Sequence, residues 1–170
     1  MKLSSVFLAI SGAAIAIVAH SPITRAQTLV PLSLYWNSDR PDAASVATRE
    51  SRNAQLESGY QEINVQGCLL ANPQPETAPL YLYWNSQRQD NASVASTALR
   101  SAQIDEGYSE VRIEGYVFLR PVPGTIPLEV WWQANRQDNA TVTTLPRQLT
   151  NEGYGKSNIE GYIYPADRCS

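Results

Sequence analysis

Three copies of one segment, spaced 48 residues apart, constrain this chain more than any other feature of its sequence. The step is kept by three sets of residues: Trp36, Trp84 and Trp132; Arg40, Arg88 and Arg136; Asp42, Asp90 and Asp138. Each copy closes with Gly-Tyr and a further Gly, and the third copy is two residues shorter between these landmarks. A repeat of this length cannot bury its apolar face alone, so three copies must share a core. We therefore expect one domain over 27–170, with copy 1 at about 31–78, copy 2 at 79–126 and copy 3 at 127–170.

Residues 1–26 have the pattern of a secretory signal peptide. Lys2 supplies a positive start, an apolar run covers 6–19, and small residues at 24–26 suit a signal peptidase. The run is short for a membrane span, which needs about 20 apolar residues, although an uncleaved anchor is the alternative. We expect a secreted or periplasmic protein that has no membrane contact after cleavage.

The composition of the remaining chain excludes several kinds of chemistry. The single histidine is His20, so residues 27–170 cannot build a histidine-dependent catalytic triad or an imidazole metal site. Two of the 13 basic residues, Lys2 and Arg25, and none of the 16 acidic ones lie in the predicted signal, which leaves a net charge of −5. An acidic chain without basic clusters argues against nucleic acid as a partner. We expect no cofactor, no metal and a monomeric, non-catalytic protein; paired carboxylates such as Glu106 with Glu110 or Glu114 are the alternative for catalysis.

Copy 2 gives the clearest secondary-structure pattern. Alternation predicts strands at 80–84 and 92–97, a turn at 85–90, a short helix at 98–106, and strands at 109–113 and 116–119 separated by Gly115. About four short strands per copy, hence about twelve, predict an all-β, β-trefoil-like fold. A three-bladed propeller is the competitor, but propellers generally need at least four blades.

The same alternation assigns the repeated aromatic residues to two faces, because neighbouring side chains of a strand point to opposite sides. Trp36, Trp84 and Trp132 share a side with apolar neighbours and are expected in the core. Tyr35, Tyr83 and Trp131 are expected on the outer side, where they form candidate stacking surfaces.

The motifs Leu82-Tyr83-Trp84, Arg88-x-Asp90-Asn91, Gly107-Tyr108 and Glu114-Gly115-Tyr116 resemble a family of triple-repeat modules of secreted bacterial and fungal proteins. The resemblance implies a trefoil-like repeat and covers nearly the whole chain after the predicted signal. The chain departs from the family in having Ala44, Ala92 and Ala140 where a Phe is usual. Copy 1 also lacks the Asn that follows Asp in the other copies.

Binding of a carbohydrate needs a few fixed polar groups beside an aromatic face. Copies 2 and 3 offer both, which makes an extracellular or cell-surface glycan the expected partner of a lectin-like module. The candidate ligand-binding residues are Arg88, Asp90, Asn91, Tyr83, Arg136, Asp138, Asn139 and Trp131. The same Arg and Asp side chains would equally serve to hold a hairpin turn. A protease inhibitor or protein-binding trefoil is the alternative function, with the connector at 70–77 as its loop.

Cys68 and Cys169 are the only cysteines. In an exported protein, two cysteines near the ends of repeats predict one disulfide, with two free buried thiols as the alternative.

Overall fold

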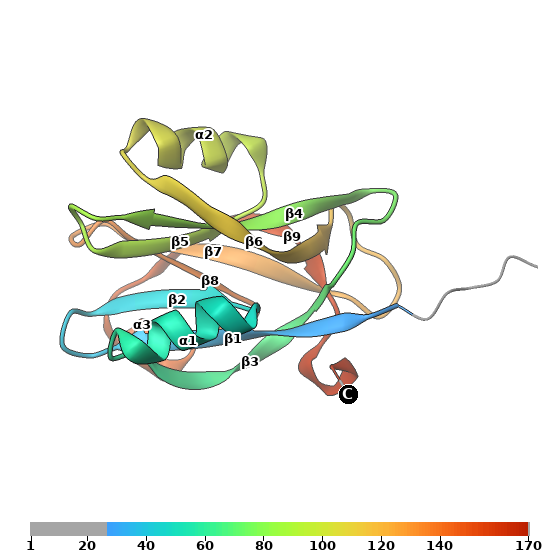
Figure 1. Ribbon diagram of the computed structural model, residues 1–170, viewed down its shortest axis with the longest axis horizontal. Coiled ribbons are helices and arrows are strands. Elements are labelled where there is room, and N and C mark those ends of the chain that lie inside the picture. Colours follow the sequence, from blue (N-terminus) through green and yellow to red (C-terminus); the bar gives the residue numbers. More distant parts are fainter. Residues whose placement is uncertain (1–26, 170) are drawn as a thin grey trace, which may run out of the picture.

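The computed structural model describes residues 27–169, so the predicted signal peptide lies outside the described part. Within 27–169 no helix is long and apolar enough to cross a membrane. Residues 27–169 are all-β: nine strands form one antiparallel sheet, and three short α-helices lie on its outside (Figure 1).

Each copy contributes three strands and one helix in the same order. Copy 1 contains β1 (Leu29–Asn37), β2 (Asp42–Val46), α1 (Arg49–Glu57) and β3 (Gln61–Leu70). Copy 2 contains β4 (Thr77–Asn85), β5 (Asp90–Val94), α2 (Thr97–Asp105) and β6 (Ser109–Phe118). Copy 3 contains β7 (Ile126–Gln133), β8 (Asp138–Val142), α3 (Arg147–Asn151), β9 (Gly155–Ile163) and a final 3-10 turn, η1 (Ala166–Arg168).

The expected division of the last strand into two pieces is wrong, because that strand bends without ending. Between β4 and β6 the register passes from Leu80↔Gly115 to Tyr81↔Ile113, which leaves Glu114 as the extra residue of a bulge. A Cβ on Gly115 would lie 2.8 Å from the Cβ of Leu69, so glycine permits the close approach of β3.

The pairing within the three copies is equivalent. The first strand of each copy pairs antiparallel with the second and with the third. The tryptophans occupy the same register on their hairpins, as Trp36↔Ala43, Trp84↔Asn91 and Trp132↔Asn139. Residues that are 48 positions apart in the sequence therefore occupy equivalent positions in the strand pairing.

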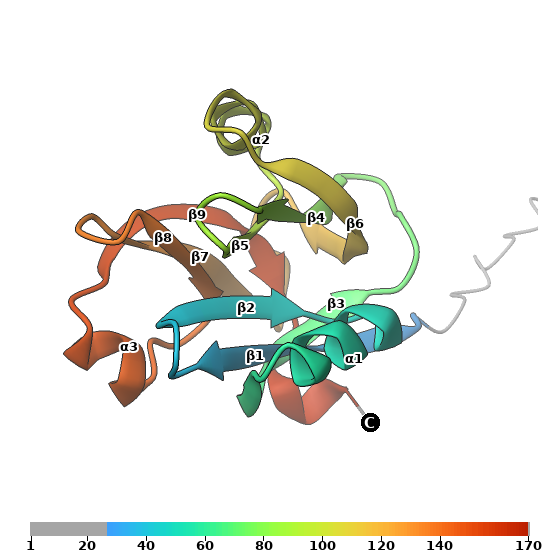
Figure 2. The ribbon, with the colours of Figure 1, turned by 60° about the vertical axis from the view of Figure 1, so that its left-hand side comes forward.

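The three copies meet at the short strands β2, β5 and β8, which pack against one another (Figure 2). Three hydroxyl groups link these strands in a cycle. Ser45 donates to the carbonyl of Thr141 at 2.5 Å, Thr141 donates to that of Ser93 at 2.6 Å, and Ser93 donates to that of Ser45 at 2.7 Å. Below them, one apolar cluster takes matching residues from every copy: Leu32, Leu80 and Leu128, with Leu69, Val117 and Ile163.

Each helix begins at a carboxylate or amide supplied by another copy. Glu114 of copy 2 accepts the backbone N–H groups of Ala47 at 2.6 Å and Thr48 at 2.7 Å, just before α1. Glu160 of copy 3 does the same for Ala95 and Ser96 before α2. A negative charge is favourable at a helix N-terminus, so these two glutamates join neighbouring copies.

The C-terminal segment is tied to the last strand of copy 1. Cys68 and Tyr164 exchange two backbone hydrogen bonds, of 2.7 and 3.1 Å. The predicted disulfide is confirmed: Cys68 is bonded to Cys169, with 5.4 Å between their Cα atoms. Copy 3 is thereby joined covalently to copy 1.

Candidate functional site

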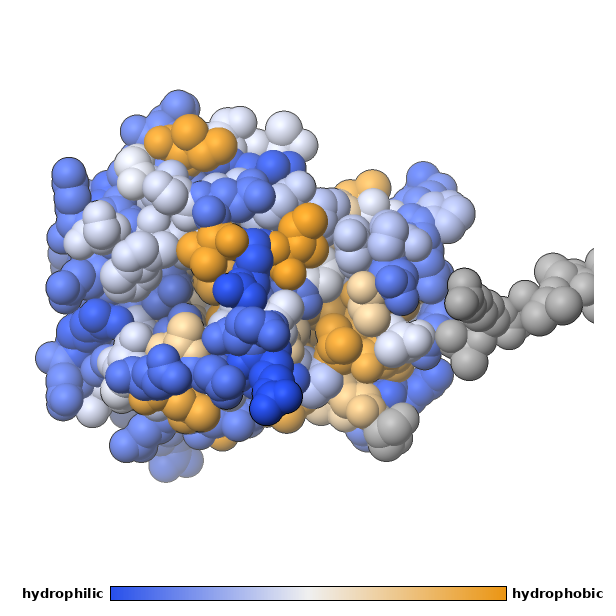
Figure 3. Space-filling view, in the orientation of Figure 1, coloured by the Kyte–Doolittle hydropathy of each residue, from blue (hydrophilic) through white to orange (hydrophobic). Residues whose placement is uncertain are grey.

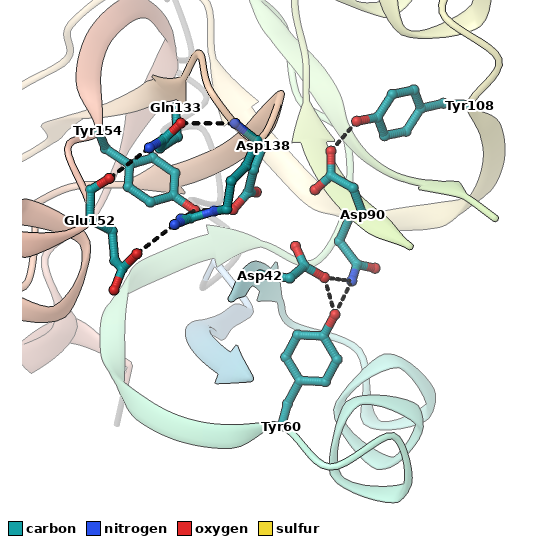
Figure 4. A network of polar contacts seen from close by, with 10 residues as sticks. Asp42, Tyr60, Asp90, Tyr108, Gln133, Asp138, Glu152 and Tyr154 are labelled. Carbon is teal, nitrogen blue, oxygen red and sulfur yellow. Dashed lines mark hydrogen bonds and ion pairs between the residues drawn. The ribbon is translucent and has the colours of Figure 1, made fainter. Parts of the chain in front are cut away.

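The repeated aspartates converge at the centre where β2, β5 and β8 begin. One carboxylate oxygen from each of Asp42, Asp90 and Asp138 lies within 4.8 Å of the other two, and none of the three residues is more than 4% exposed. Each carboxylate accepts the hydroxyl of the tyrosine that closes its own copy (Figure 4). These tyrosines of the Gly-Tyr pairs are Tyr60, Tyr108 and Tyr154. We call these six residues the aspartate–tyrosine centre.

Burial and mutual repulsion keep protons on this centre. Loss of hydration, followed by repulsion from Asp138 and Asp42, raises the pKa of Asp90 to about 10. Burial, followed by repulsion from Asp42, raises the pKa of Asp138 to about 7, and burial raises the pKa of Asp42 as well. Three facing carboxylates of this kind share protons at neutral pH rather than carry three charges.

The repeated arginines form the rim of the centre around a cavity of about 220 Å³. Arg40 donates to the hydroxyl of Tyr60 at 3.1 Å, and Arg136 donates to that of Tyr154 at 3.3 Å. The carboxylates have the number and proximity to bind a cation, but tyrosine hydroxyls and guanidinium groups already surround them. The arrangement accordingly holds the three turns together, which agrees with the structural alternative for the Arg and Asp residues.

The turns themselves are fixed by a residue that sequence analysis did not select. The side-chain oxygen of Asn85 accepts the N–H groups of Gln87 and Arg88, both at 3.0 Å, and Asn37 plays the same part in copy 1. The Asp residues are therefore free to face the centre instead of capping their own turns.

A groove of about 300 Å³ lies between copies 1 and 2, between α1 and the β4–β6 pair. We call it the first groove. Trp84 forms one wall as a half-buried indole, and the amides of Gln55 and Asn91 form the floor, 3.4 Å apart. Asn91 also donates to Asp42 at 3.1 Å and to Tyr60 at 2.9 Å, so the floor is anchored on the aspartate–tyrosine centre. Figure 3 shows the face that carries α1, with apolar side chains set among strongly hydrophilic ones.

The junction of copies 2 and 3 repeats this groove with a volume of about 210 Å³. In this second groove Trp132 is the wall, and Gln103 and Asn139 are the floor. Both floor residues are at least nine-tenths buried, yet the Gln103 Oε1 and Asn139 Nδ2 atoms have no hydrogen-bond partner in 27–169. A buried polar atom without a partner costs about 1–3 kcal/mol, so this floor is less well satisfied than that of the first groove, where the two amides bond each other at 3.4 Å.

The junction of copies 3 and 1 has the same backbone but an apolar filling. Leu149 replaces the floor glutamine and Ala43 replaces the floor asparagine. These two residues pack with Leu34 and Trp36 in one cluster, where Leu149 is 1% exposed. Two of the three junctions therefore have a polar floor beside an indole, and the third does not.

The assignment of the aromatic residues to faces is wrong. Tyr83, expected outside, is fully buried, and Tyr35 is 2% exposed. In copy 2 the helix folds back over its own hairpin: Leu99 of α2 packs against the Tyr83 cluster, and Arg100 donates to the Tyr83 hydroxyl at 3.2 Å. Tyr83 is thus no stacking surface, and the tryptophans expected in the core are half-buried walls of the junctions.

The remaining candidates separate into two places. Arg88, Asp90, Arg136 and Asp138 line the central cavity, while Asn91 and Asn139 lie on the floors of the two grooves. Trp131 is half-buried and packs against the apolar cluster of the third junction. Sequence reasoning missed Gln55, Gln103, Trp84 and Trp132 as groove residues. A comparison of the copies could have found the glutamines. The two copies with Gln at the helix position face Asn in the next copy, whereas Leu149 faces Ala43.

No family model, no curated protein and no solved structure matches this chain. Its function must therefore be argued from the geometry of the site.

Proposed function

We propose that this chain is a secreted, non-catalytic module that binds carbohydrate in the first and second grooves. One observation carries the proposal: a half-buried tryptophan stands beside a buried pair of side-chain amides in two of three equivalent junctions. Sugars present hydroxyl groups together with apolar C–H faces, and an indole beside fixed amides complements both.

The contacts of the acidic side chains support the non-catalytic part of the proposal. Glu114 is buried as the acceptor before α1, and Glu106 pairs with Arg88 at 2.6 Å. The aspartates of the centre are buried and bonded to tyrosine hydroxyls. Two of the carboxylates considered for hydrolysis, Glu106 and Glu114, are thus engaged in structural contacts.

The β-trefoil-like architecture and the relation to the triple-repeat modules belong to the same proposal. Equivalent hairpins, the cycle of hydroxyl bonds between β2, β5 and β8, and pairing among the ends of β3, β6 and β9 support pseudo-threefold symmetry. The disulfide supports a site of action outside the cytoplasm, where such bonds persist.

The third junction supplies the design of the test. Gln55→Leu with Asn91→Ala copies into the first groove the apolar pair that the chain already tolerates as Leu149 and Ala43. The wild-type protein, residues 27–170, is first screened on a glycan array beside a panel of proteases. For a glycan that binds, calorimetry should give an affinity of the first groove at least tenfold weaker in the double variant than in the wild type.

The matched control is the equivalent change in the second groove, Gln103→Leu with Asn139→Ala. Loss of both grooves should abolish binding, while circular dichroism shows an intact fold. Glycan binding that survives in the quadruple variant, or inhibition of a protease without any glycan binding, would contradict the proposal.

A further inference from the structure

The two grooves differ in charge although they share a wall and a floor. The first groove is lined by the guanidinium groups of Arg40 and Arg112 and by no carboxylate. In the second groove Glu106 is a lining residue, and Asn158 occupies the position equivalent to Arg112. The ligand of the first groove therefore meets two positive groups that the second groove lacks.

Arg40 is distinguished from its two counterparts by the residue that caps the C-terminus of the helix in its own copy. Arg88 pairs with Glu106 at 2.6 Å, and Arg136 pairs with Glu152 at 2.5 Å. Copy 1 has Ser58 at this position, and within 27–169 Arg40 makes no ion pair. Its guanidinium instead lies over the indole of Trp84, 5.5 Å from the ring centroid. Arg40 is thus held beside the groove by Tyr60 and Trp84 without a direct ion pair in the described residues.

Arg112 adds a second cation to the lining of the groove. Its contact with Glu50 is long, 3.6 Å, and Glu50 is 67% exposed, so this ion pair contributes little. The Arg112 side chain is 38% exposed and lines the groove. Guanidinium groups bind carboxylates through paired N–H donors, and they do so more strongly where water is excluded.

We propose that the first groove binds a carboxylate-bearing sugar, namely a uronate unit of an acidic polysaccharide, while the second groove takes an uncharged unit. This inference rests on the proposed carbohydrate function. The carboxylate lies between Arg40 and Arg112, the C–H face of the ring stacks on Trp84, and hydroxyl groups bond to Gln55 and Asn91. A volume of about 300 Å³ suits a single sugar unit of a longer chain.

The test compares uronate oligosaccharides with their methyl esters, which keep the ring and remove the charge. Calorimetry with wild-type protein should show at least tenfold tighter binding of one acid form than of its ester. Ser58→Glu places beside Arg40 the acid that Arg88 and Arg136 already have, and Ser58 is exposed at the end of α1, so the fold should be kept. This variant should lose the preference for the acid and bind the ester as wild type does.

The reciprocal change, Glu106→Ser, releases Arg88 and should give the second groove a measurable preference for the acid form. A sulfated oligosaccharide of the same length tests whether any anion suffices; binding equal to that of the uronate would overturn the assignment to a carboxylate. Equal binding of acid and ester to wild-type protein overturns this inference alone. If no oligosaccharide binds, the proposed function fails with it.

Discussion

The third junction differs from the other two in what holds it together, and the difference separates stability from the proposed binding. The first and second junctions join copies that are consecutive in the chain. The third joins copy 3 back to copy 1, where no peptide connects them. It has the apolar Leu149–Ala43 filling and lies between the copies that the Cys68–Cys169 bond links. The other two keep polar floors and a groove.

This contrast indicates a division of labour between junctions with the same backbone. A junction that is already linked by the chain pays little entropy for closure, so it tolerates buried amides that are imperfectly satisfied. The closing junction has to supply its own association and uses apolar burial and a covalent bond. The proposed binding grooves therefore lie at the two junctions that the chain itself already links.

The largest effect is expected from opening the covalent closure. The disulfide has a sequence separation of 101 residues, and closing such a loop contributes on the order of 4–5 kcal/mol in the chain-entropy model. Cys68→Ala with Cys169→Ala should lower the free energy of unfolding by up to about this amount in denaturant titrations. Hydrogen exchange should increase first in β3, β9 and α3. Uniform loss of protection over all three copies would contradict a special role of the third junction.

The next largest effect is expected at the fillings themselves. Leu149→Ala empties a fully buried apolar site and should cost about 2–5 kcal/mol. Gln55→Ala at the equivalent position removes one 3.4 Å hydrogen bond at a groove floor and should cost about 1 kcal/mol. Urea titrations of both variants give the two values. Equal costs would show that the junctions do not differ in how they contribute to stability.

Local pattern in the sequence was sufficient for the order of strand, turn, strand and helix within copy 2. The helix expected at 98–106 is α2 at Thr97–Asp105, and the turn expected at 85–90 separates β4 from β5. The same residue pattern recurs in each copy, so the clear pattern of copy 2 supports the assignment of elements in the other two. The disulfide also followed from the position of two cysteines at repeat ends and the expected export.

The exposure of the aromatic residues did not follow from alternation, because alternation separates two faces but does not say what covers each. α2 covers the face that carries Tyr83, and the neighbouring copy faces Trp84. The role of Glu114 was equally out of reach of a local pattern, since its partners are 66 and 67 residues away in another copy. Contacts between copies decide the site, and they appear in the sequence only as differences among equivalent positions.

A smaller effect is expected at the acceptors before the helices, where the junctions again differ. The third junction uses a neutral side chain: Gln66 Oε1 accepts the N–H of Thr143 at 2.9 Å. Glu114→Gln makes the first junction resemble it and should cost about 1–2 kcal/mol, because charge-assisted bonds at a helix N-terminus are replaced by neutral ones. Thermal unfolding measures the loss, with Gln66→Glu as the reciprocal variant. No loss in Glu114→Gln would mean that the charge has no part in joining the copies.

The last expected effect is a dependence of stability on pH that originates where all three junctions meet. The pKa of Asp138 is raised to about 7 by burial and by repulsion from Asp42, whereas an unfolded aspartate has a pKa of about 3.9. Between these values the folded chain retains a proton that the unfolded chain has lost, so this contribution to stability is complete below about pH 4 and is lost as the pH rises through 7. Asp138→Asn keeps the shape and removes the charge. The variant should show a smaller fall in its unfolding midpoint between pH 4.5 and 8 than the wild type, measured by circular dichroism at constant ionic strength. An unchanged slope would indicate that the carboxylates of the aspartate–tyrosine centre do not share protons. It would also remove this centre as a common electrostatic constraint on the two grooves and the apolar junction.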